Sequence, residues 1–146
     1  MKAIAAHVIG KEAQIDTRAL SEFSWSFGIL RMKHVALCTS LVANALPRLG
    51  AFTPQALADF VAGLAFVDAH EDLKSVMITE TKDKKESLGE AFLGAVAHEI
   101  KTQLKKFPLK AITSLAFSLL KMQLPDPALF TLLQDVIVSF GAPKTP

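Results

Sequence analysis

The side chains that could do chemistry in this sequence are four histidines, one cysteine and 14 carboxylates. His98-Glu99 begins like the His-Glu-x-x-His helix of zinc proteases, in which both histidines bind the metal from one helix face. The second histidine would fall at position 102, which is Thr102, so the motif fails. His70 precedes two carboxylates, but adjacent residues on a helix diverge in direction, and a solvated helix end is the simpler interpretation.

Patterns for nucleophilic or phosphate chemistry are also lacking. The single cysteine, Cys38, has apolar neighbours, which predicts a buried thiol and gives no basis for a disulfide. The glycines are scattered and form neither a phosphate loop nor a nucleophile elbow. We therefore expect no enzyme activity, no metal, no cofactor and no small-molecule substrate.

The basic residues are the remaining candidates for binding. The formal net charge is only +2, so their placement matters more than their number. One group occupies equivalent positions of a repeat described below, one clusters near residues 101–106 with an i, i+4 pair at 101 and 105, and one lies at a turn. Phosphate contacts with salt-sensitive affinity are the functional interpretation, and an ordinary solvated helix face is the alternative. The predicted RNA contacts are Arg18, Gln55 and Lys110, then Lys101, Lys105 and Lys106, and finally Arg31 and Lys33.

Three ungapped segments, beginning at Arg18, Gln55 and Lys110, share a pattern that predicts the helices carrying these residues. Each has alanine, then Leu or Ile, then Phe or Leu three and seven residues after that. Offsets of three and four mark one apolar face of a helix. A small residue (Ser26, Gly63 or Ser118) precedes the last position and would let another helix approach closely. The copies are 37 and 55 residues apart, so the middle one carries 18 extra residues.

Second helices align in the same register, with Leu37, Phe92 and Leu129 at matching positions. The sequence therefore predicts an all-α fold, an α-solenoid of antiparallel helical hairpins with a 37-residue repeat. We expect helices at about 2–10, 17–31, 34–47, 54–70, 87–106, 109–122 and 127–140. The single domain 1–146 divides into a partial hairpin 1–15, a repeat 16–52, a repeat 53–107 with a charged insertion at about 74–89, and a repeat 108–146.

Capping chemistry supports this division. Asp16 can cap the helix that begins at residue 17, and Ser87 with a glutamate three residues later is typical of a capping box. Thr53 and Asp126 each precede a proline, which favours the first turn of a helix. The charged insertion is either a mobile solvated loop or an arm that becomes ordered on a partner.

The composition and the ends of the sequence indicate the setting in which the domain works. Hydrophobic residues make up 51% of the chain, yet the longest stretch without a charge or a histidine, 35–47, is too short to span a bilayer, so we expect no membrane insertion. The apolar residues must be buried in the fold or under partners. No capping repeat is recognisable at either end, which predicts a piece of a longer repeat protein or a component of a large assembly. No targeting presequence is visible either.

Segments 19–30, 56–67 and 111–122 resemble the octotricopeptide and heptatricopeptide repeats, and are similar to repeats of FAST-kinase-like and RAP-domain proteins. The octotricopeptide proline-rich signature is absent, and no RAP domain follows. The resemblance implies a mitochondrial or plastid protein associated with RNA. A structural component of a mitochondrial ribosome or ribonucleoprotein, contacting rRNA and neighbouring proteins, is the leading hypothesis. A protein–protein scaffold, such as an accessory subunit of an organellar membrane complex, is the alternative.

Overall fold

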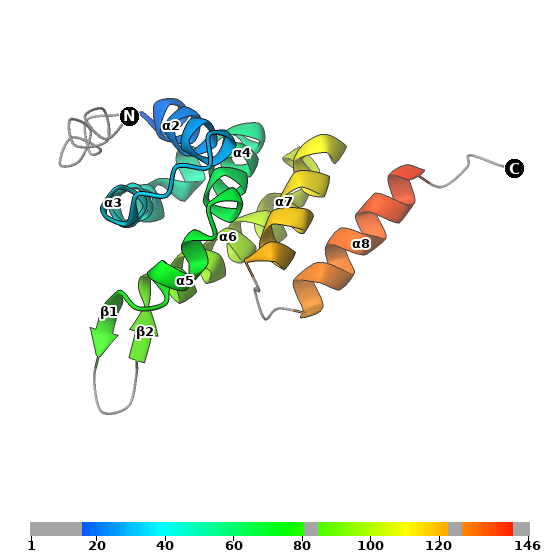
Figure 1. Ribbon diagram of the computed structural model, residues 1–146. Coiled ribbons are helices and arrows are strands. Elements are labelled where there is room, and N and C mark those ends of the chain that lie inside the picture. Colours follow the sequence, from blue (N-terminus) through cyan, green and yellow to red (C-terminus); the bar gives the residue numbers. More distant parts are fainter. Residues whose placement is uncertain (1–15, 81–84, 123–126, 142–146) are drawn as a thin grey trace, which may run out of the picture.

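The computed structural model describes residues 16–80, 85–122 and 127–141, and in these ranges the fold is all-α with one short two-stranded ribbon (Figure 1). The α-helices are α2 (Thr17–Ile29), α3 (Val35–Ala45), α4 (Pro54–Phe66), α5 (Ala69–Leu73), α6 (Leu88–Gln103), α7 (Leu109–Lys121) and α8 (Pro127–Gly141). The 3-10 helices are η2 (Leu46–Ala51) and η3 (Leu104–Lys106), and the strands are β1 (Met77–Glu80) and β2 (Lys85–Ser87).

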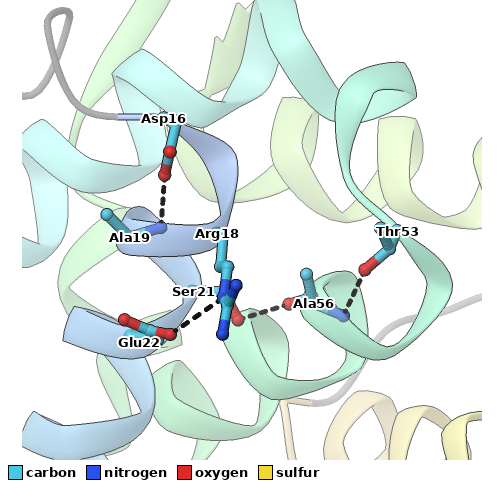
Figure 2. A network of polar contacts seen from close by, with 7 residues as sticks. All are labelled: Asp16, Arg18, Ala19, Ser21, Glu22, Thr53 and Ala56. Atoms are coloured by element: carbon cyan, nitrogen blue, oxygen red, sulfur yellow. Dashed lines mark hydrogen bonds and ion pairs between the residues drawn. The ribbon is translucent and has the colours of Figure 1, made fainter.

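Local capping chemistry begins three of the helices as predicted. Asp16 Oδ1 accepts a hydrogen bond from the Ala19 amide at 2.8 Å, and Thr53 Oγ1 accepts one from the Ala56 amide at 3.2 Å (Figure 2). The Ser87 hydroxyl likewise accepts from an amide of the first turn of α6. These oxygens satisfy helix-start donors that have no partner inside the helix. Asp126 and the predicted partial hairpin 1–15 lie outside the described residues.

Helix α4 is the centre of the molecule, because it packs against α2 and against α7. Its apolar residues face in almost every direction, and Leu57, Phe60 and Leu64 are each no more than 1% exposed. The Phe60 ring lies between the rings of Phe52 and Phe92, with centroid distances of 5.4 and 5.8 Å. A helix that is apolar all round has to be buried, and here α2 and α7 provide much of the cover.

Small residues bring α2 and α4 into close contact. The Ser24 hydroxyl donates to the Phe60 carbonyl at 2.7 Å, and a Cβ placed on Gly63 would lie 2.1 Å from the Ser24 carbonyl oxygen. Gly28 also lies close to Gly63, whose Cα would be 2.6 Å from a Cβ on Gly28. The prediction that a small residue at 63 allows close approach of another helix is confirmed, whereas Ser26 is exposed. Contact partners advance in the same order along both helices, so α2 and α4 run parallel.

Backbone turns break three of the predicted helices. The expected helix 54–70 ends at Phe66 because Asp68 has a φ of 52°, and the chain restarts as α5. The expected helices 34–47 and 87–106 end as α-helices at Ala45 and Gln103, and each continues as a 3-10 helix. Arg31 also has a positive φ, of 53°, and its amide donates to the Gly28 carbonyl, which closes the end of α2.

Part of the charged insertion at about 74–89 forms a two-stranded ribbon, which the sequence analysis did not predict. Strands β1 and β2 pair in antiparallel register, with Met77 opposite Ser87 and Glu80 opposite Lys85. The Leu88 amide donates to the Val76 carbonyl and joins the ribbon to the start of α6. Residues 81–84 lie outside the described residues. The proposed role as an arm ordered by a partner is not tested by this arrangement.

The helices follow one another as pairs, α2 with α3 and α7 with α8, while α5 and the ribbon separate α4 from α6. This order agrees with an all-α architecture of hairpins. The 37-residue repeat and the solenoid go beyond what the fold class establishes, and both stay predictions.

Candidate binding surfaces

The row predicted from Arg18, Gln55 and Lys110 lies at the starts of α2, α4 and α7. Thr17 Oγ1 donates to the Ala51 carbonyl at 3.4 Å, so the starts of α2 and α4 lie at the same end of the parallel pair. Helix α7 packs on the other side of α4. The three residues therefore lie in the first turns of three helices, of which α4 contacts both α2 and α7.

Carboxylates accompany the first two members of this row. Arg18 Nε lies 3.2 Å from Glu22 Oε1, one helical turn later, and both side chains are largely exposed (Figure 2). Gln55 Nε2 donates to Asp59 Oδ1 at 3.0 Å with the same spacing. A phosphate approaching either position would meet a carboxylate as well as a donor, so the attraction for RNA is weakened there. Lys110 is exposed at the start of α7.

The second predicted cluster surrounds the junction of α6 and α7. Lys105 and Lys106 are exposed on η3, and buried Phe107 fixes this short helix to the core. α6 ends at Gln103 and η3 follows, so Lys101 and Lys105 do not belong to one continuous α-helix, and a shared face for them stays a prediction. Chain connectivity nevertheless keeps these lysines near Lys110, since only η3 and a short link separate α6 from α7.

The last two predicted RNA contacts, Arg31 and Lys33, lie in the turn between α2 and α3, and their environments differ. Arg31 is exposed at the left-handed residue of the turn. Lys33 Nζ lies 2.6 Å from Asp72 Oδ2 on α5, and the hydrogen bond to this carboxylate raises the pKa of Lys33. This ion pair ties the turn to α5, so Lys33 has a structural role that the sequence did not indicate. No local spacing could have shown it, because its two residues belong to different helices.

His34 and Cys38 have structural roles in the fold. His34 caps α3, its Nδ1 accepting from the Leu37 amide at 3.1 Å. Cys38 is buried as predicted, and desolvation raises the pKa of its thiol, which disfavours the reactive thiolate. Across the described ranges, no three His, Cys, Asp or Glu residues gather as a metal site. In those ranges no helix combines the length and the apolar character needed to cross a bilayer.

Residue types alone did not indicate the apolar groove between α7 and α8. A groove of about 380 Å³ lies between α7 and α8. Leu120 and Val138 at this groove are 62% and 60% exposed, which is high for large aliphatic side chains. Its lining residues are Ala116, Leu120, Phe130, Leu133, Gln134, Ile137 and Val138.

Comparison with known proteins identifies no relative. The chain matches no family model, and no curated protein or solved structure is significantly similar to it. The class of the protein therefore follows from its fold: it is an all-α protein with an open apolar groove and a basic junction between two helices.

Proposed function

We propose that the chain is a non-catalytic helical-repeat scaffold that binds neighbouring proteins of a larger assembly through its uncovered apolar helix faces. The groove between α7 and α8 carries this proposal, because it exposes Leu120 and Val138 beside a cavity of about 380 Å³. Monomeric proteins rarely leave such a surface uncovered. The carboxylates beside Arg18 and Gln55 also favour a protein partner over RNA on that part of the surface.

Two features support the 37-residue repeat in this proposal. Arg31 and Asp68 both have a φ near 50°, at the ends of α2 and α4, and they are 37 residues apart. In addition, α2 packs on α4 and α4 packs on α7, which is the stacking that consecutive first helices of a solenoid require. The left-handed residues at a spacing of 37 and the packing of α4 against both α2 and α7 support the proposed repeat.

Site-specific photo-crosslinking tests the proposal. A benzoylphenylalanine at position 120 should crosslink to a defined protein in native extract, whereas the same group at exposed position 102, on α6, should not. A crosslink that is equal at both positions, or that forms with RNA at position 120, would contradict the scaffold. The altered chains should keep the helical circular dichroism of the wild type.

An RNA-associated structural role is the second candidate, and the junction of α6 and α7 favours it. Lys105, Lys106 and Lys110 are exposed there, and no carboxylate is paired with them among the described residues. Such a patch suits phosphate contacts without base recognition. The mitochondrial ribosome as its location is inferred from the repeat resemblance alone.

A salt series separates the two candidates. If RNA binds at the junction, replacing Lys105 and Lys110 by alanine should weaken binding and reduce the dependence of the dissociation constant on salt by about one unit of slope per lysine. Lys74→Ala is the matched control, because Lys74 is exposed at the end of α5, away from the junction. Equal effects of both changes, or a flat salt response, would exclude this RNA surface.

A further inference from the structure

The groove between α7 and α8 has a counterpart elsewhere in the chain that is filled. Ser24 on α2 and Cys38 and Leu41 on α3 line a small cavity at the junction of α2, α3 and α4. The residues 92 positions later, Ala116, Phe130 and Leu133, line the open groove. The two surfaces therefore use corresponding positions of the helix pairs α2–α3 and α7–α8.

Helix α4 closes the first of these surfaces. Gly63, Leu64 and Val67 of α4 contribute to its wall, and the space that remains is about 10 Å³. The second surface keeps about 380 Å³ because no described helix covers it. Gly28 of α2, which corresponds to Leu120 of α7, is buried at the first surface, whereas Leu120 is 62% exposed at the second. The open groove thus has the form of a helix-binding site from which the helix is absent.

The filled counterpart specifies which helix would fit. The covering helix must run parallel to the first helix of the pair and carry a small residue where the backbones meet, as Gly63 does against Ser24. Helix α2 has Ser26 at the position corresponding to Gly63, and Ser26 is exposed. Leu30, which corresponds to Val67, is 55% exposed. A shallow hollow of about 230 Å³ surrounds Ser26 and is lined also by Ala19, Glu22 and Phe23.

Charge also matches between the two open surfaces. In the α2–α4 contact, residues 21 and 56 touch through the Ser21 hydroxyl and the Ala56 carbonyl, an offset of 35. By extension of this offset, Arg18 aligns in register with Thr53, the residue that caps α4. At the corresponding position of α7 stands Lys110, and the residue that caps α2 is Asp16, an exposed carboxylate. An α2 docked on α7 in this register would bring a lysine next to an aspartate.

We propose that the α7–α8 groove binds α2 of a second copy of this chain, head to tail, with Ser26 against Ala116 and Asp16 of the second copy beside Lys110. This inference rests on the proposed repeat scaffold and identifies its partner. Because the two surfaces differ, each added copy exposes a new groove, and association gives short linear oligomers rather than a closed dimer.

Sedimentation velocity over a concentration series tests the inference on the whole chain. The weight-average mass of the wild type should rise from monomer past dimer as the concentration increases. Leu120→Glu blocks the groove and Ser26→Arg blocks the α2 surface, so each variant alone should be monomeric at concentrations at which the wild type associates. Phe117→Glu is the matched control, because Phe117 is on the same helix, is 65% exposed and does not line the groove. It should associate like the wild type.

Mixing the two blocked variants gives the decisive result. Ser26→Arg keeps an intact groove and Leu120→Glu keeps an intact α2 surface, so an equimolar mixture should form a one-to-one dimer and nothing larger. A mixture that stays monomeric, a wild type that stays monomeric at all concentrations, or an equal loss with Phe117→Glu would overturn head-to-tail association. Crosslinks from position 120 to another protein would still support the scaffold in each of those cases. Circular dichroism of each variant confirms that it is folded.

Discussion

The junction of α2, α3 and α4 and the groove between α7 and α8 are built from corresponding positions but have opposite environments. At the junction, α4 fills the space between two helices and leaves about 10 Å³. At the groove, the same kind of surface keeps about 380 Å³ and exposes Leu120. The comparison shows that burial in this molecule is set by whether a neighbouring helix is present, because the side chains on the two surfaces are similarly apolar.

The largest expected difference concerns two adjacent leucines of α7. Leu119 is fully buried, so Leu119→Ala should lower the free energy of unfolding by about 3 kcal/mol, through lost transfer energy and a cavity. Leu120→Ala should change it by less than about 0.5 kcal/mol at concentrations at which the chain is monomeric. Urea unfolding of both variants measures the difference. Equal losses would mean that Leu120 is covered in the free protein.

Substitution of Gly63 tests the close contact between α2 and α4. Gly63→Ala should destabilise the fold by about 2 kcal/mol, because its Cβ would lie 2.1 Å from the Ser24 carbonyl oxygen and α2 must move away. Gly94→Ala is the control, since nothing lies within 4 Å of a Cβ there and α6 gains up to about 1 kcal/mol of helix propensity. Thermal unfolding should therefore shift in opposite directions. A neutral Gly63→Ala would show that α2 and α4 are less closely packed.

Substitutions of two serines of α2 distinguish the face that α4 covers from the face that is exposed. Ser24→Ala removes the hydroxyl that donates to the Phe60 carbonyl at 2.7 Å and should cost about 1 kcal/mol. Ser26→Ala, two residues away on the exposed side, should cost less than about 0.5 kcal/mol. Chemical denaturation resolves this difference, and a larger effect at 26 would reverse the assignment of the two faces.

The smallest expected effect is a pH dependence at the filled junction, where Cys38 occupies the position that Phe130 has in the groove. Burial raises the pKa of this thiol in the folded state above its unfolded value of about 8.5. The folded state therefore holds the proton more tightly, and its advantage is complete below pH 8.5 and is lost as the pH rises through the folded-state pKa. The free energy of unfolding should fall between pH 7.5 and about 9.5 more in the wild type than in Cys38→Ala. Parallel pH profiles would contradict this assignment.

Sequence reasoning predicted most helix starts correctly, because the groups that begin a helix are local. The Asp16, Thr53 and Ser87 caps all form as expected. Helix ends were less predictable. The break at Asp68 depends on a left-handed residue that is not glycine, and nothing in the neighbouring residue types indicates it.

In the candidate site, too, local features could be predicted from the sequence and contacts between distant segments could not. The starts of α2 and α4 lie together, and the i, i+4 spacing of Arg18 with Glu22 could have been read from the sequence. The ion pair of Lys33 with Asp72 could not, because the distance between them is set by how α5 packs on α3. Lys101 and Lys105 do not share one continuous α-helix, because α6 ends at Gln103 and a 3-10 helix follows.

The sequence by itself determined where the helices begin, which of their faces are apolar and that Cys38 would be buried, since capping, periodicity and composition act over a few residues. Only the tertiary structure decided which apolar faces are covered. Gly28 and Leu120 stand at corresponding positions of α2 and α7, yet Gly28 is buried and Leu120 is 62% exposed. The physical reason is that burial requires a second surface, and the described fold places one, α4, against α2 and none against this face of α7.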